Sequence, residues 1–217
     1  MKNLMRLALL LFPLLPVFAD EPVQPSDYRG KKAVVLLFMR GSNPKFACHF
    51  CSLQTKAYKS AYEELRKLDA EVLVVLPGAD DVPTYLKNVG TDEEKDSDPN
   101  FTIPFPVLLD RDFSLCKAYE VPFKPGGQPF PVSEPATVVL GKDGQVLYAY
   151  HGKNPPDRPT VETVLAVLQG KKVDPSKAEP EPAKPAGPTL PWVGYEEGMK
   201  AAKAEKKPVL LDFYGDW

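Results

Sequence analysis

Two cysteines three positions apart, in the segment Cys48-His-Phe-Cys51, are the residues of this sequence best suited to do chemistry. They follow an apolar, strand-like run and stand at the start of a helix-like one. A thiol at a helix N-terminus faces unpaired backbone N–H groups and the positive end of the helix dipole, which favour the reactive thiolate. A second thiol one turn further on can attack a mixed disulfide formed by the first. The spacing therefore predicts a redox-active dithiol.

Two other groups bear on this chemistry: His49, between the thiols, and Cys116, the third cysteine of the chain. A protonated imidazole beside Cys48 would lower the pKa of that thiol, whereas a solvent-facing His49 would have little effect. Cys116 is predicted to be a buried, apolar-like residue rather than a distant resolving thiol. Because no second Cys/His pair completes four ligands, the sequence predicts no zinc site, and we expect neither metal nor cofactor.

The elements that would position these residues alternate between strand and helix. Apolar runs, helical periodicity and turn residues predict strands at 33–39, 71–76, 105–109, 136–140 and 145–150, and helices at 49–68, 80–88, 112–119 and 160–169. The last two strands form a hairpin through the turn at 141–144, and a Pro/Gly-rich loop occupies 121–135. This order predicts an α/β fold, a mixed central sheet flanked by helices on both faces. The dithiol would then lie beyond the carboxyl end of a strand.

The first residues of the chain have the pattern of an export signal. Residues 1–19 combine basic Lys2 and Arg6 with an apolar stretch and a small-residue cleavage site at Ala19. The alternative is a membrane anchor, but the apolar stretch 7–18 is short of the ~20 residues that span a bilayer. We expect an exported protein, periplasmic or extracellular, with no stable membrane span after signal cleavage. The net charge of −2 and the scattered basic residues predict no nucleic-acid partner.

Proline marks the next boundary, since part of the excess in this chain (25 prolines in 217 residues) falls between 173 and 191. Such a segment behaves as an extended, semi-rigid linker. It follows a first domain at 20–172 and precedes a fragment, 192–217, in which a helix is predicted at 195–206 and a strand at 207–214. That fragment is too short to form a core of its own.

Several segments resemble the thioredoxin-like redoxin group that includes the peroxiredoxins of the AhpC/TSA type. They are Leu37-Phe-Met-Arg-Gly41, Ala47-Cys-His-Phe-Cys-Ser-Leu-Gln54, Phe105-Pro-Val-Leu-Leu-Asp110, Ala118-Tyr-Glu-Val121 and Glu134-Pro-Ala-Thr137. The resemblance covers about 28–170 and implies a thioredoxin fold. The fragment 192–217 resembles the truncated start of a second thioredoxin-like domain, in which C-x-x-C would follow at once. One hypothesis is that the gene product continues past residue 217, and a sharper version is that a selenocysteine codon at that point was read as a stop.

Within this group the resemblance implies two competing chemistries. Thioredoxin-like oxidoreductases use C-x-x-C, in which the first cysteine attacks and the second resolves. Peroxiredoxins use P-x-x-x-T-x-x-C, in which the last cysteine attacks peroxide. Here Pro44 is in place and Cys48 occupies the Thr position. We therefore expect an exported thiol-disulfide oxidoreductase with Cys48 attacking and Cys51 resolving, and keep a thiol peroxidase with Cys51 as the peroxidatic cysteine as the alternative.

The resemblance also implies accessory residues and partners. Pro135 is expected to be a cis-proline beside the dithiol that shapes a substrate groove. An apolar substrate surface formed by Phe50, Phe123 and Phe130 is an alternative to their being packing residues. A third reading is a Sco-like copper carrier in which His151 joins the cysteines, although those carriers use C-x-x-x-C. The expected partners are protein thiols and disulfides, or peroxides, together with an upstream thiol reductant.

Overall fold

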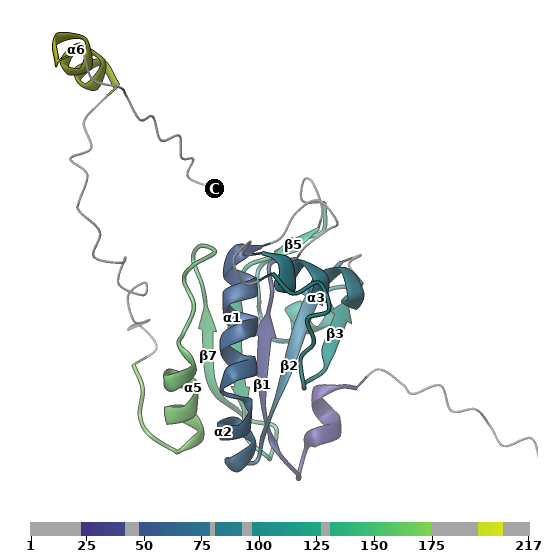
Figure 1. The fold of residues 1–217 in the computed structure, drawn as a ribbon. Helices are drawn as coiled ribbons and strands as arrows, with labels where there is room; N and C mark the ends of the chain where they lie inside the picture. Colours follow the sequence, from purple (N-terminus) through teal and green to yellow (C-terminus); the bar gives the residue numbers. More distant parts are fainter. Residues whose placement is uncertain are drawn as a thin grey trace, which may run out of the picture.

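A five-stranded mixed sheet organises the chain, as seen in a computed structural model (Figure 1). The structure describes residues 23–41, 48–78, 81–92, 97–126, 131–174 and 195–205. The strands are β1 (Ala33–Phe38), β2 (Ala70–Pro77), β3 (Val107–Asp110), β6 (Ala136–Leu140) and β7 (Val146–His151). Their order in the sheet is β3-β2-β1-β6-β7. β1 and β3 both run parallel to β2, whereas β6 is antiparallel to β1 and to β7.

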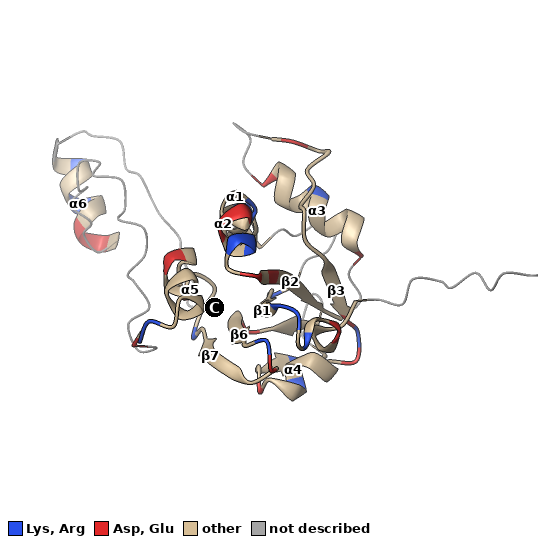
Figure 2. Ribbon diagram, turned by 90° about the horizontal axis from the view of Figure 1, so that it is seen from below, with Lys and Arg blue, Asp and Glu red and all other residues tan. Residues whose placement is uncertain are grey.

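Helices cover both faces of this sheet. One face carries α1 (His49–Ser60), α2 (Tyr62–Lys67), α3 (Val82–Thr91) and α5 (Val161–Leu168), and the opposite face carries α4 (Ser114–Ala118). Figure 2 shows the sheet between α1, α2 and α3 on one side and α4 on the other. A short 3-10 helix, η1 (Pro25–Tyr28), precedes β1. The predicted α/β architecture, a thioredoxin fold with helices on both faces, is confirmed.

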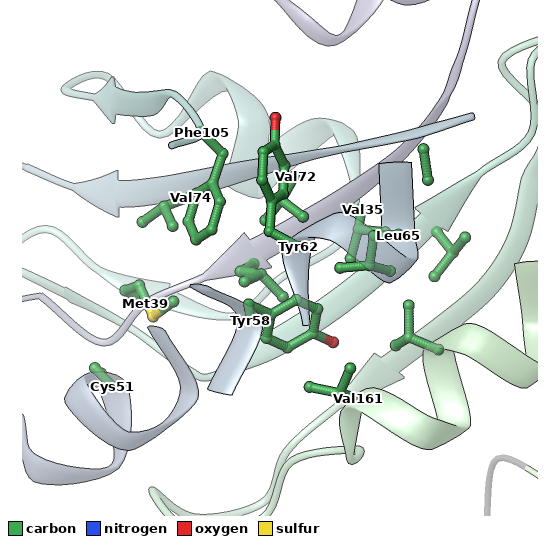
Figure 3. Close-up of a cluster of buried hydrophobic side chains, with 14 of the residues drawn as sticks. Val35, Met39, Cys51, Tyr58, Tyr62, Leu65, Val72, Val74, Phe105 and Val161 are labelled. Carbon is green, nitrogen blue, oxygen red and sulfur yellow. The ribbon is translucent and has the colours of Figure 1, made fainter. Parts of the chain in front are cut away.

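The central strand β1 divides the core in two because successive side chains of a strand point to opposite faces. Val35, Leu37 and Met39 pack with α1, α2 and α5 on one face, where Tyr58 is among the largest buried side chains. Figure 3 shows this cluster, with Met39 close to Cys51 of α1. Val34, Leu36 and Phe38 pack on the other face against the region of α4. All residues of β1 are buried, which explains their continuous apolar pattern.

Most of the observed elements begin and end within a few residues of the predicted ranges. β3 begins after Pro106, β6 occupies 136–140, and the N-cap of α3 is Asp81, whose carboxylate accepts a hydrogen bond from the Thr84 N–H at 2.7 Å. The cap of α5 is Thr160, whose hydroxyl accepts from the Thr163 N–H. These boundaries depend on local residue chemistry, which a sequence displays directly.

Two predictions of local structure were wrong. The single helix expected at 49–68 is divided at Ala61 into α1 and α2. The Ser60 hydroxyl donates to the Lys56 carbonyl at 3.1 Å, a back-bond that bends helices at this kind of position. The loop expected at 121–135 contains a small antiparallel ladder of β4 (Phe123–Lys124) and β5 (Val132–Ser133).

The two ends of the chain are described only in part. Helix α6 (Tyr195–Glu205) agrees with the helix predicted there. The expected signal at 1–19, nearly all of the linker and the strand expected at 207–214 lie outside the described residues. The division into 1–19, 20–172, 173–191 and 192–217 therefore stays a prediction. Within the described ranges, no helix is long and apolar enough to cross a membrane.

Candidate active site

The two cysteines of the C-x-x-C segment form a disulfide at the first turn of α1, with their Cα atoms 5.2 Å apart. Cys48 is the N-cap of the helix and Cys51 is its third residue. Both side chains are nearly inaccessible, with exposed fractions of 6% for Cys48 and 2% for Cys51. The backbone N–H of Arg40, just beyond the carboxyl end of β1, donates to Cys51 Sγ at 3.4 Å. The pair therefore lies at the strand end where the sequence places it.

A second donor to the same sulfur comes from the loop before α5. Arg158 Nη2 donates to Cys51 Sγ at 3.3 Å. Two donors thus converge on Cys51, whereas among the described residues none donates to the sulfur of Cys48. Burial lowers the pKa of Arg158 to about 10, so its guanidinium remains protonated at neutral pH. A fixed cation and an N–H group at this distance stabilise negative charge on sulfur, and they do so at Cys51.

The Arg158 side chain is held by hydrogen bonds to neutral groups. Its Nε donates to the Pro155 carbonyl at 2.9 Å, and its Nη1 donates to Gln54 Oε1. Gln54 is one helical turn after Cys51 on α1, and its Nε2 reaches Thr137 Oγ1 on β6 at 3.4 Å. Residues from α1, β6 and the loop before α5 therefore fix the guanidinium against the disulfide.

The backbone of that loop is also fixed. The Asp157 carboxylate accepts hydrogen bonds from the Tyr150 hydroxyl and from the Lys153 N–H. Gly152 donates its N–H to the Pro135 carbonyl at 2.8 Å, and a Cβ at Gly152 would collide with the Asp157 carbonyl oxygen. Only glycine permits this close approach. These contacts fix the backbone of the loop that carries Arg158.

The accessory residues predicted from the sequence are placed as follows. His49 Nδ1 lies 2.7 Å from a carboxylate oxygen of Asp92, at the end of α3, and its side chain is half-exposed. Pro135 is buried between β5 and β6, in the segment that contacts the Arg158 loop. Pro44 lies outside the described residues. The proposed roles of all three stay predictions.

A groove adjoins the site between α1, the loop before α5 and α5 itself, with a volume of about 870 Å³. Phe50 and Leu53 contribute apolar surface from α1, with exposed fractions of 36% and 37%. Gln54 and Arg158 also line the groove, which links it to Cys51. Of the other aromatic residues considered for such a surface, Phe123 packs elsewhere, stacked on Phe113 with ring centres 4.6 Å apart. Phe130 lies outside the described residues.

The remaining candidate residues lie away from the disulfide. Cys116 is a free thiol on α4, fully buried on the opposite face of the sheet, as predicted. Burial and the neighbouring Asp110 carboxylate raise the pKa of Cys116 to about 12. His151 is exposed at the end of β7. In the part of the chain that the structure describes, no three His, Cys, Asp or Glu side chains are grouped so as to hold a metal ion.

Arg158 and Gln54 are the residues that reasoning from the sequence missed. Arg158 is 107 positions from Cys51, so no local spacing connects the two. The available signal was a single arginine in a Pro-rich loop directly before a helix that begins with a Thr cap. Gln54 has a weaker signal, a polar residue on the inner side of α1, where it is only 7% exposed.

Comparison with known sequences identifies a family. Residues 14–149 match the profile of the AhpC/TSA family. The chloroplastic peroxiredoxin Q of Oryza sativa subsp. japonica is 28% identical over 152 residues, which are 68% of this chain and 58% of the rice protein. Peroxiredoxin Q of Sedum lineare is also 28% identical, over 70% of this chain and 71% of that protein. The chain thus spans less than two thirds of the length of the rice relative.

Solved structures agree on the fold. The reduced 2-Cys peroxiredoxin of Plasmodium vivax superposes with a TM-score of 0.52 at 21% identity, over 66% of this chain and 67% of that one. The bacterioferritin comigratory protein of Xanthomonas campestris, described for its alkyl peroxide reduction activity, gives a TM-score of 0.50 at 21% identity. That match covers 70% of this chain and 85% of the other. At such identities the likeness establishes the fold alone.

Proposed function

Because the chain belongs to the AhpC/TSA family, we propose that it is a thiol peroxidase in which Cys51 attacks the peroxide and Cys48 resolves the product. The observation that carries this proposal is the pair of donors on Cys51 Sγ, the Arg40 N–H at 3.4 Å and Arg158 Nη2 at 3.3 Å. The thiolate is the nucleophile, and both donors stabilise it at Cys51. This assignment reverses the roles that the C-x-x-C pattern favours.

The proposed cycle starts from the dithiol. The Cys51 thiolate attacks one peroxide oxygen, the O–O bond breaks, and the alcohol or water leaves after taking up a proton. Cys51 is then a sulfenic acid, which Cys48 attacks to form the S–S bond with release of water. The disulfide present in the structure corresponds to the product of that step. No metal or cofactor is needed for this sequence of steps.

Return to the dithiol requires an external thiol reductant. Attack on Cys48 Sγ, which belongs to the slightly more exposed of the two residues, expels Cys51 as a thiolate. A leaving thiolate that is stabilised departs faster, so the Arg158 contact favours this step as well. The thiol-disulfide exchange expected from the sequence thus becomes the second half of a peroxidase cycle.

The groove beside the site supports an organic hydroperoxide as substrate. Its apolar wall at Phe50 and Leu53 offers a surface for the organic group, while Arg158 at the same groove contacts the attacking sulfur. Burial of apolar surface contributes about 25 cal/mol per Å² to such binding. A protein with this groove would have a higher kcat/KM for an organic hydroperoxide than for hydrogen peroxide.

Single-cysteine variants test the assignment. Cys51→Ser is expected to abolish consumption of hydroperoxide, whereas Cys48→Ser keeps one rapid turnover and then stalls. The measurement is peroxide loss in a stopped-flow assay, first without and then with a dithiol reductant. A Cys51→Ser protein that consumed peroxide at the wild-type rate would eliminate the proposal and restore Cys48 as the attacking thiol.

Export and domain organisation belong to the same proposal. We take 1–19 as a signal peptide, 20–172 as the redoxin domain, 173–191 as a linker, and 192–217 as the start of a second thioredoxin-like domain. In a periplasmic or extracellular compartment the disulfide would persist until the external thiol reductant acts on it. Mass analysis of the protein recovered from its native compartment checks this, since cleavage after Ala19 leaves Asp20 as the first residue.

A further inference from the structure

A histidine–aspartate pair joins the start of the helix that carries the disulfide to the end of a neighbouring helix. His49 is the first residue of α1, directly after Cys48, and its Nδ1 lies 2.7 Å from a carboxylate oxygen of Asp92. Asp92 is the C-cap of α3, and its side chain is only 8% exposed. Helices α1 and α3 lie side by side on one face of the sheet (Figure 2). The pair thus fixes the imidazole that follows Cys48 in the chain.

Helix stability does not explain why these two residues stand where they do. A protonated histidine in the first turn of α1 faces the positive end of the helix dipole, and a carboxylate at the C-cap of α3 faces the negative end of its own. Both helices would be more stable with the two charges exchanged. The positions are therefore better explained by the chemistry of an oriented imidazole than by stabilisation of either helix.

The carboxylate also decides which ring nitrogen of His49 can act as a base. A carboxylate only accepts hydrogen bonds, so in the neutral imidazole Nδ1 donates to Asp92 and Nε2 carries the lone pair. Among the described residues, Nε2 has no hydrogen-bond partner, and the side chain is 51% exposed. Nε2 is therefore an oriented base that a molecule from solution can reach.

The other titratable side chains of the groove do not offer such a base beside Cys48. Those that line it among the described residues are His49, Tyr58, Glu64, Arg158 and Glu162. Burial raises the pKa of the Tyr58 hydroxyl, and the Arg158 guanidinium is protonated at neutral pH. Glu64 belongs to α2 and Glu162 to α5, whereas His49 is bonded to Cys48 through the backbone.

We propose that His49 is the general base of the reductive half of the cycle, and that Asp92 is the positioning residue that orients its ring. Nε2 takes the proton from the incoming reductant thiol as the sulfur of that thiol attacks Cys48 Sγ. The inference deepens the proposed function and rests on its assignment of Cys48 as the sulfur that the reductant attacks.

A dithiol reductant reacts in two exchanges. In the first, one thiol gives its proton to His49, its sulfur bonds to Cys48 Sγ, and the Cys48–Cys51 bond breaks with Cys51 leaving as the thiolate beside Arg158. In the second, the other thiol loses its proton to water and attacks the reductant sulfur of the mixed disulfide, and Cys48 leaves and takes the proton from His49. Two electrons pass to the protein, the reductant becomes a disulfide, and one proton is released.

A general base helps only a thiol that arrives protonated. A thiol whose pKa lies about one to two units above the pH is ionised to about 1–10%, so its full deprotonation by a base gains at most about 10- to 100-fold. A thiol that is already ionised gains nothing. The acidity of the reductant therefore separates catalysis by His49 from a structural role of the pair, which would affect both kinds of thiol alike.

The test follows reduction of the disulfide in the full chain by two monothiols. At about pH 8, mercaptoethanol is mostly protonated and trifluoroethanethiol is mostly ionised. Samples are quenched with an alkylating agent, and the free thiols are counted by mass spectrometry. The rate with mercaptoethanol relative to that with trifluoroethanethiol should fall about tenfold in His49→Gln and several-fold in Asp92→Asn.

His151→Gln is the matched control, because it removes the other histidine of the chain, which is exposed at the end of β7. It should leave the ratio of the two rates unchanged. Imidazole added to a His49→Ala protein supplies a base from solution, and it should restore part of the rate with mercaptoethanol without accelerating the wild type.

An unchanged ratio in His49→Gln would overturn the proposal, as would equal slowing with both thiols. None of these measurements involves peroxide. A protein that shows the expected ratios but consumes no peroxide would reject the proposed function and keep this inference. Unchanged ratios in a protein whose Cys51 is oxidised by peroxide would reject this inference alone.

Discussion

Replacing Arg158 by methionine removes the guanidinium from Cys51 while keeping an unbranched side chain in the loop. The charged hydrogen bond from Nη2 to Cys51 Sγ at 3.3 Å disappears, while the Arg40 N–H remains at 3.4 Å. Hydrogen bonds to charged groups contribute about 1.5–3 kcal/mol. Since one pKa unit is about 1.4 kcal/mol, the pKa of Cys51 should rise by about one to two units.

The rise in the pKa of Cys51 determines how the rate of peroxide reduction depends on pH. A guanidinium stabilises the thiolate, so its removal shifts the pH profile of peroxide reduction to higher pH. Below both pKa values the second-order rate constant should fall by about 10- to 100-fold, and above both the two proteins should converge. Arg158→Lys keeps a positive charge but lacks the planar guanidinium with its several N–H donors, so its rate should lie between those of the wild type and Arg158→Met.

The assay is the initial rate of hydroperoxide loss across a pH series, with the alkylation rate of Cys51 measured in parallel. Thermal unfolding of each variant serves as the control for a merely structural effect. A folded Arg158→Met protein with the wild-type midpoint in both profiles would show that the arginine contributes nothing to the charge on Cys51, contrary to this prediction.

Three further predictions concern the groove, the third thiol and the core. Leu53→Glu should slow turnover of a bulky organic hydroperoxide several-fold and leave hydrogen peroxide turnover nearly unchanged, as measured by kcat/KM for each. In the reduced, folded protein at about pH 8, an alkylating agent should modify two thiols and spare Cys116, whose burial raises its pKa to about 12; a third adduct in the folded protein would contradict that placement. The Tyr58 hydroxyl is buried with no hydrogen-bond partner among the described residues, so Tyr58→Phe should raise the free energy of unfolding by about 1 kcal/mol. Tyr85→Phe removes a bond to a threonine hydroxyl at 2.5 Å and should lower it by about the same amount, both measured by denaturant unfolding.

Much of the fold follows from local sequence patterns. The continuous apolar run of β1 predicted a strand, which the structure shows buried on both faces, and helical periodicity predicted α3 and α5 to within a few residues. The division at Ala61 escaped prediction because helical periodicity continues across it. The Ser60 hydroxyl donates to the Lys56 carbonyl next to this division, and such side chain-to-backbone bonds compete with the helix without changing the periodicity.

The sequence predicted only those features of the site that depend on residues close together in the chain. The position of the two cysteines at a helix start after a strand follows from spacing, and the structure agrees. What distinguishes one sulfur from the other does not follow from spacing. Helix-end electrostatics favour Cys48, whereas the chain brings the Arg40 N–H and the Arg158 guanidinium to Cys51. The second of these contacts joins residues 107 positions apart, and only the tertiary fold creates it.

The most direct test of the account is to locate the first oxidised sulfur. Reduced Cys48→Ser protein is treated with one equivalent of hydroperoxide in the presence of a reagent that traps sulfenic acids, and the labelled residue is identified by peptide mass spectrometry. We expect a single label on Cys51, formed at the rate of peroxide loss. In the reciprocal Cys51→Ser protein, rapid labelling of Cys48 would contradict it and return the attacking role to the first cysteine.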